Sequence, residues 1–361
     1  MREEPRGFAL LLTGHIVSTF GSSIYVVVLV LYLADATDSA RPLGLVQFLS
    51  YLPAALLGPI AGAAVDAWDR KRIVVWSDVA RGVIMVLTAT VGLVHGELPV
   101  WLLIGATAAV SLSGVLFVPA VHALVPDLVP EQRLRSANGV RSAGTQLANL
   151  AGSAGGGVLF LLLGAPLVIL ANGITFLVSG ISELGVRPRT EKPAGGERSA
   201  SSLVRRAMAG ARLVLRTRGL RALVGTQALL NLLLPPLVVA MPFVITDVWL
   251  LSADYFGYLF GAVLAGGVTG FLLFSRGSLS PRGEARAYRV AIPLLVTALV
   301  ALSALAAGGA TGSGSTLLLF GAMFVAGGSV GVTHMIGVTV LQRTTAPGLR
   351  GRVFAALEML T

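Results

Sequence analysis

The side chains able to carry out acid–base or metal chemistry are few in this chain and lie far apart. Four histidines (His15, His95, His122 and His334) show no spacing typical of metal ligands, and the chain contains no cysteine. The sequence contains no glycine-rich phosphate-binding loop. We therefore predict no enzyme activity, no cofactor and no metal site.

One short segment concentrates charge beside small residues. Residues 62 to 72 read Gly-Ala-Ala-Val-Asp-Ala-Trp-Asp-Arg-Lys-Arg. Gly62 permits close helix approach. The carboxylate of Asp66 is able to cap the N-terminus of a neighbouring helix or to pair with an arginine. The alternative interpretation is a basic loop that carries a carboxylate by chance.

A second charged pair follows in the next helix. Asp78 and Arg81 stand about one turn apart on one helix face, so we expect an ion pair between them. A purely structural pair and a gating pair are both compatible with this spacing.

The elements that position these groups follow from composition. Hydrophobic residues make up 55% of the 361 residues and charged residues only 12%, against about 25% in ordinary soluble chains. Mean hydropathy is +0.83. A soluble enzyme is therefore excluded, and we predict an all-α, multi-pass integral membrane protein. The net charge of +10 is explained by membrane orientation, so no nucleic-acid partner is expected.

Ten spans are predicted, because a span needs about 20 mostly apolar residues. A turn at Gly164-Ala165 separates the fifth from the sixth, and an eleventh span begins near Val353 and stops at Thr361. The ten spans lie at about residues 8–33, 43–65, 73–94, 100–124, 136–163, 166–186, 220–245, 255–274, 290–307 and 316–341.

Basic residues alternate between loops in a way that predicts orientation. They gather before the first span and after every second span, whereas the other loops hold only Arg41. Since positive loops stay on the cytoplasmic side, we expect a cytoplasmic N-terminus and a location in the plasma or inner membrane.

The long polar segment at 187–219 predicts a linker between an N-terminal six-helix half, 1–186, and a shorter C-terminal half, 220–361. Its second part predicts an amphipathic helix with Val204, Met208, Ala211 and Leu215 on one face, either on the membrane surface or as a solvated linker. Residues 125–139 and 342–356 both contain a proline followed by Arg-x-Arg. This repeat predicts a twelve-helix protein truncated at its C-terminus, or else a genuine ten-span protein.

The segment from Gly62 to Arg72 resembles the signature of the major facilitator superfamily, Gly-x-x-x-Asp with a basic tail. Gly62, Asp66, Arg70, Lys71 and Arg72 match, whereas Ala67 and Asp69 depart. The resemblance implies that this segment locks the outward-facing state and couples the two halves. The phrases at 47–53 and 124–130 and the Asp-x-x-Arg resemble the macrolide-efflux and enterobactin-exporter branch. Helix-packing glycines (Gly152, Gly155 and Gly156) resemble a drug-antiporter motif, with Ser153 in place of its proline.

Polar residues within spans are candidates for lining a substrate cavity. They are His15, Thr19, Ser22, Gln47, Tyr51, Gln146, Asn149, Gln227 and Asn231. His15 titrates near neutrality and is a candidate proton carrier. We predict a secondary-active exporter of amphipathic small molecules such as drugs or siderophore-like metabolites, working by alternating access with protons. The alternative is a truncated membrane protein that is non-transporting or regulatory.

Overall fold

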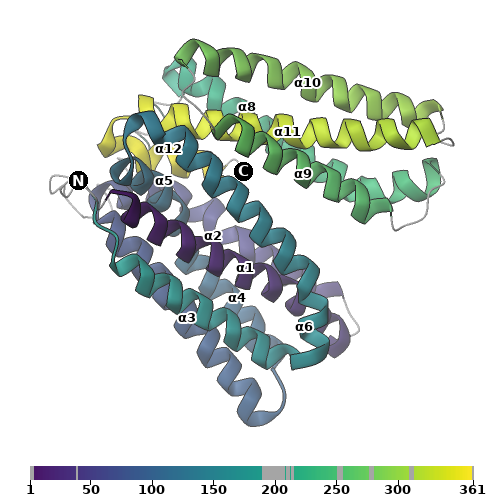
Figure 1. Ribbon diagram of the computed structural model, residues 1–361. Helices are drawn as coiled ribbons and strands as arrows, with labels where there is room; N and C mark the ends of the chain where they lie inside the picture. Colours follow the sequence, from purple (N-terminus) through teal and green to yellow (C-terminus); the bar gives the residue numbers. More distant parts are fainter. Residues whose placement is uncertain are drawn as a thin grey trace. The chain divides into compact units, whose positions relative to one another are not determined.

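The computed structural model describes residues 4–37, 40–188, 208, 212, 215–249, 255–275, 280–308 and 313–359 (Figure 1). Within these ranges every regular element is a helix. Helices satisfy all backbone polar groups internally, which a chain this apolar requires inside a bilayer.

Eleven long helices and three short helical turns follow one another in the described ranges. The short turns are η1 (Glu131–Arg133), η2 (Val244–Val248) and η3 (Pro347–Leu349). The long helices are α1 (Glu4–Thr37), α2 (Ala40–Ala67), α3 (Arg70–His95), α4 (Val100–Gly114), α5 (Phe117–Leu128), α6 (Leu134–Leu184), α8 (Arg218–Phe243), α9 (Tyr255–Ser275), α10 (Pro281–Gly308), α11 (Ser313–Thr344) and α12 (Arg350–Met359).

Seven of the described helices are long and apolar enough to cross a membrane, or eight when the bent pair at Arg41–Gly58 and Ile60–Ala67 counts as one span. The number of about ten spans stays a prediction. α6 runs for 51 residues, but its backbone leaves the helical region at Gly164, with φ 73° and ψ 166°. This break lies where the sequence predicts the turn between the fifth and sixth spans.

Several helices begin before the predicted boundaries, and the fourth predicted span is divided. α3 begins at Arg70 because the side chain of Asp69 accepts a hydrogen bond from the Arg72 amide at 3.2 Å. α10 begins at Pro281, several residues before the predicted apolar run. The fourth predicted span consists of α4 and α5, which are separated at residues 115 and 116.

The chain divides into two compact units. Unit 1 comprises residues 1–131, 147–218 and 342–359, and unit 2 comprises 132–146, 219–341 and 360–361. Most of the predicted linker at 187–219 lies outside the described residues, including Val204 and Ala211. Met208 and Leu215 are helical and exposed.

Unit 1 has an apolar core to which α1, α3 and the second arm of α6 contribute, among them Val28, Met85 and Ile169. Glycines let these helices approach closely. A Cβ at Gly82 of α3 would lie 3.0 Å from the carbonyl oxygen of Gly173 in α6. Small residues at such contacts are typical of membrane helices.

Unit 2 is held by an even closer helix contact. A Cβ at Gly266 of α9 would collide with the Phe324 carbonyl of α11, and one at Gly327 of α11 would collide with the Val263 carbonyl of α9. Apolar side chains on either side, such as Phe271 and Met335, complete this packing. Replacement of either glycine would therefore separate the two helices.

Candidate functional site

The carboxylate of Asp66 caps the start of α12. Its Oδ1 accepts a hydrogen bond from the Gly351 amide at 2.7 Å, and its Oδ2 accepts from the amide of Arg352 at 3.3 Å. The Nε of Arg352 also donates to Oδ2, at 3.0 Å. Since the first amides of a helix lack partners within it, Asp66 satisfies two of them and also pairs with an arginine.

A second carboxylate joins the same region. Asp127 of α5 accepts from Arg70 Nη1 at 2.6 Å and lies 3.4 Å from Arg350 Nη1. Arg70 also donates to the backbone carbonyls of Ala123 and Pro347. The guanidinium of Arg70 thus connects α3 to α5 and to the turn that precedes α12.

Further contacts hold the start of α12 and the residues before it against neighbouring elements. The rings of His122 in α5 and Phe354 in α12 stack with centroids 4.8 Å apart. Gln342 donates to the carbonyl of His122 at 3.0 Å, and Arg343 donates to that of Glu131 at 3.3 Å. Residues 342–354 therefore form one docked segment against α2 and α5.

The remaining residues of the 62–72 segment have separate positions. The Gly62 carbonyl lies where a Cβ on Gly351 would collide, so the missing side chain of Gly351 permits the contact between α2 and α12. Lys71 donates to the Leu184 carbonyl at the end of α6, at 2.6 Å. Arg72 is exposed and lies 3.8 Å from Asp69.

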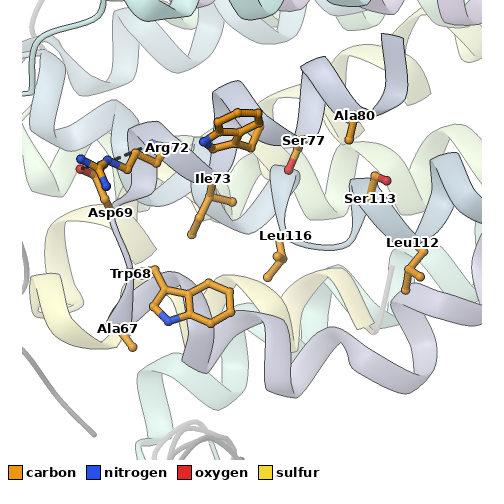
Figure 2. Close-up of a pocket in the computed structure, with 11 residues that line it drawn as sticks. Ala67, Trp68, Asp69, Arg72, Ile73, Ser77, Ala80, Leu112, Ser113 and Leu116 are labelled. Atoms are coloured by element: carbon orange, nitrogen blue, oxygen red, sulfur yellow. Dashed lines mark hydrogen bonds and ion pairs between the residues drawn. The ribbon is translucent and has the colours of Figure 1, made fainter. Parts of the chain in front are cut away.

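A pocket of about 490 Å³ opens beside this segment, between the ends of α2, α3 and α4. Figure 2 shows Trp68, Arg72 and Ser77 around it. Apolar side chains, among them Ile73 and Leu116, form the rest of its wall. Indoles beside a basic side chain are typical of the region where a membrane protein meets lipid headgroups.

Asp78 and Arg81 form the expected ion pair, with Oδ1 and Nη2 2.6 Å apart. The guanidinium lies over the rings of Phe117 and Phe176, at 4.1 and 4.9 Å from their centroids. Asp78 is buried and Arg81 is half-buried within unit 1, so the interaction is little screened by solvent.

The candidate cavity residues of unit 1 have different environments. His15 lies 5.7 Å from the ring of Phe117, and Ser22 donates to the Ser18 carbonyl one turn before it. Asn149 accepts a hydrogen bond from Ser23 at 2.7 Å, which joins α6 to α1. Three further candidates are half-buried or exposed: Thr19, Gln47 and Tyr51.

In unit 2, Gln227 is buried and its side-chain nitrogen lies 3.0 Å from His334 Nδ1. Gln146 is half-buried. Asn231 lies in α8, and its side chain is outside the described part of the structure.

The glycines of the resembled drug-antiporter motif lie in unit 1. A Cβ at Gly152 would lie 2.7 Å from the Phe20 carbonyl, and one at Gly156 would lie 2.7 Å from the Cβ of Val27. A Cβ at Gly155 would meet no described atom within 4 Å. Gly152 and Gly156 thus bring α6 close to α1, and Gly155 does not.

The two repeated sequence phrases have the same local structure. In each, a short 3-10 turn, η1 or η3, leads directly into a helix, α6 or α12. In unit 1, Gly351 faces the Gly62 carbonyl and Asp66. In unit 2, Gly139 of α6 faces the Phe271 carbonyl and Ser275 of α9. A serine therefore stands where the first contact has a carboxylate.

Several participants were not singled out by the sequence. Asp127 lies in the first repeated phrase, and Arg350 and Arg352 lie in the second. The similarity between the two phrases is the sequence signal that draws attention to these residues. Glu183 lies beside Asp78 and Arg81 although it is far from them in sequence. No spacing rule links Glu183 to this pair.

The family model described as Major Facilitator Superfamily matches residues 11–361. The chain belongs to the major facilitator superfamily. It is accordingly an integral membrane protein of a transporter family, and relatives of this superfamily member include efflux proteins.

Macrolide efflux protein A of Streptococcus pyogenes is 28% identical over 259 residues, which are 69% of this chain and 59% of that protein. The aligned part thus spans less than two thirds of that relative's length. The putative bacilysin exporter BacE of Bacillus subtilis is 41% identical over 123 residues, covering 34% of this chain and 30% of that protein.

Solved structures agree on the fold of this superfamily member. A bacterial homologue of the iron transporter ferroportin, in an outward-facing state, has a TM-score of 0.75 at 22% identity, covering 99% of this chain and 89% of that one. The transporter FucP in the outward conformation has a TM-score of 0.70 at 14% identity, with coverages of 99% and 89%.

Proposed function

We propose that the protein is a secondary-active exporter of amphipathic small molecules, working by alternating access and driven by protons. The observation that carries this proposal is the capping of α12 by Asp66. This contact joins residues from opposite ends of the sequence through hydrogen bonds that can be broken and remade. A transporter that alternates between two states needs such reversible contacts.

The names of the relatives support the direction and the substrate class. One similar protein is named a macrolide efflux protein and another a putative bacilysin exporter. Macrolides are large amphipathic molecules, and the polar candidates in the spans are mostly uncharged. Substrate contacts by His15, Thr19, Ser22, Gln146 and Gln227 belong to this proposal, as do contacts by Gln47, Tyr51, Asn149 and Asn231.

The proposed topology has a cytoplasmic N-terminus and two halves, 1–186 and 220–361, joined by the linker at 187–219. The alternation of basic loops supports it. In this topology the docked segment and the pocket of Figure 2 lie at the inner membrane surface. The 62–72 segment is then the proposed conformational lock, together with Asp78 and Arg81.

Accumulation of erythromycin and of ethidium in a bacterial host without its own efflux pumps tests the proposal. Cells that produce the full-length protein are expected to retain less of at least one probe, and a protonophore should abolish the difference. The variant Asp66→Ala should lose export, whereas Asp69→Asn should keep it, because Asp69 caps α3 and not α12.

Absence of export for a panel of amphipathic cations and macrolides, with the wild-type protein correctly inserted, would favour the alternative of a non-transporting membrane protein. Binding of a probe without its export would also favour the non-transporting alternative. Export that resists the protonophore would retain the exporter and remove the proton coupling.

A further inference from the structure

Two carboxylates and one guanidinium share a buried cluster in unit 1. Asp78 and Arg81 come from α3, and Glu183 comes from the last turn of α6. The exposed fraction is 0% for Asp78 and 1% for Glu183. Both carboxylates interact electrostatically with Arg81 and with each other.

Close helix packing fixes this arrangement. Gly180 of α6 lies against α3, where a Cβ on it would be 3.6 Å from the Cβ of Asp78. Gly14 of α1 leaves room for Ser179, whose hydroxyl donates to Glu183 Oε1 at 3.4 Å. These small residues thus let the carboxylates of α3 and α6 lie close together.

The charges of the cluster do not balance. Arg81 is paired with Asp78 at 2.6 Å, and the two aromatic rings cover its guanidinium. The second oxygen of Glu183, Oε2, is buried and has no hydrogen-bond partner among the described residues. One negative charge is thus in excess where charge is costly, and two carboxylates that share a site cannot both remain ionised without penalty.

We propose that Asp78, Arg81 and Glu183 form a proton-binding site, with Glu183 as the carboxyl group that gains and loses the proton. When the proton is bound, the cluster contains one ion pair and one neutral acid. When the proton leaves to water, the cluster carries one net negative charge. The use of this proton to drive export rests on the function proposed above, whereas proton binding does not.

Other titratable groups near the cluster come from the elements packed against it. The ring of His15 in α1 has its centroid 5.7 Å from that of Phe117. Lys71 of α3 reaches the Leu184 carbonyl beside Glu183. α5 contributes the ring of Phe117, which carries no charge.

The position of the cluster suits proton release on one side. Glu183 is the penultimate residue of α6, and Lys71 reaches the carbonyl of the residue after it. In the proposed topology these helix ends face the cytoplasm, which is where an inward-moving proton must be released. Acidic side chains in such positions are typical of proton relays.

Infrared spectroscopy of the purified protein in lipid nanodiscs tests proton binding without any substrate. We expect the carbonyl-stretch band of a protonated carboxylic acid, equivalent to about one proton per chain, which disappears as the pH is raised. Glu183→Gln should remove it. The matched control is Asp127→Asn, which should leave the band unchanged because Asp127 pairs with Arg70 and Arg350 and takes no part in the cluster.

Thermal unfolding provides a second measurement that does not depend on the variant being active. Wild-type protein should lose thermal stability as the pH rises and the proton leaves, whereas Glu183→Gln should lack this loss because its amide stays neutral. The absence of any titrating carboxyl band in wild type, or a band that persists in Glu183→Gln, would overturn the proposal.

Coupling is then measured in everted vesicles with whichever probe is exported, erythromycin or ethidium. Glu183→Gln should keep probe counterflow but lose uptake driven by a pH gradient, by about tenfold or more. A normal pH-driven rate in a variant that lacks the infrared band would overturn the coupling role and leave the exporter function standing. If Glu183→Gln also loses probe counterflow, Glu183 is needed for probe exchange itself, which would contradict a role confined to proton binding.

Discussion

Replacement of Asp66 with alanine is expected to release the start of α12 from α2. The carboxylate accepts three hydrogen bonds, from the amides of Gly351 and Arg352 at 2.7 and 3.3 Å and from Arg352 Nε at 3.0 Å. Alanine leaves these donors without their acceptor and leaves the guanidinium of Arg352 without its counter-charge.

The size of the effect follows from the types of interaction that alanine removes. Removal of an N-terminal cap costs about 0.5–2 kcal/mol, and removal of a hydrogen bond to a charged group costs about 1.5–3 kcal/mol. These contributions share one carboxylate and are not additive, so we expect about 2–3 kcal/mol in total. Since about 1.4 kcal/mol is tenfold, the undocked form should become about 30 to 150 times more populated.

Cysteine labelling measures this opening directly. The chain has no cysteine, and Val353 of α12 is completely buried, so Val353→Cys should react with a membrane-permeant maleimide only when α12 undocks. Asp66→Ala should accelerate labelling about 30- to 150-fold, in proportion to the population of the undocked form. Asp69→Asn is the control, because Asp69 caps α3 instead. Equal labelling rates with and without Asp66 would refute the reasoning.

Three further outcomes are expected from single replacements. Gly164→Ala should destabilise the protein by about 1–3 kcal/mol, because φ 73° with ψ 166° is accessible essentially to glycine alone; Gly96→Asn, at φ 79° and ψ −15°, should cost much less in the same thermal unfolding measurement. Arg70→Lys should reduce export even though charge is retained, because a single ammonium cannot replace the guanidinium that contacts Asp127 and two carbonyls; normal export would contradict this. Gly156→Val should lower the folded yield, measured by size-exclusion chromatography, since a Cβ there would lie 2.7 Å from a valine of α1.

The sequence was most informative where neighbouring residues act together. The turn at Gly164 and the ion pair between Asp78 and Arg81 depend on local spacing, and both are present in the structure. The capping by Asp66 was foreseeable as a type of contact, because a carboxylate at a helix end needs donors. The identity of the helix that Asp66 caps could not be foreseen, because it depends on which helices pack together.

Contacts between distant segments were the main omissions. Glu183 reaches Asp78 only because α3 and α6 pack through glycines. Asp127 pairs with Arg70 because α5 lies beside α3. The closest glycine contact in unit 2 joins α9 to α11, in helices whose glycines formed no motif that we singled out. In each case the side chains are ordinary, and only the tertiary arrangement makes them partners.

In the contact of Gly351 with α2 and in that of Gly139 with α9, the glycine faces a backbone carbonyl and a nearby side chain, but the side chain differs in chemistry. The first adds a carboxylate that accepts hydrogen bonds, whereas the second has Ser275, whose hydroxyl donates to the Leu272 carbonyl of its own helix. The first contact depends on one ionisable side chain, whereas the second depends on a glycine that meets a carbonyl. Removal of that single carboxylate would therefore loosen one contact and spare its counterpart, so the two helix contacts can be weakened independently.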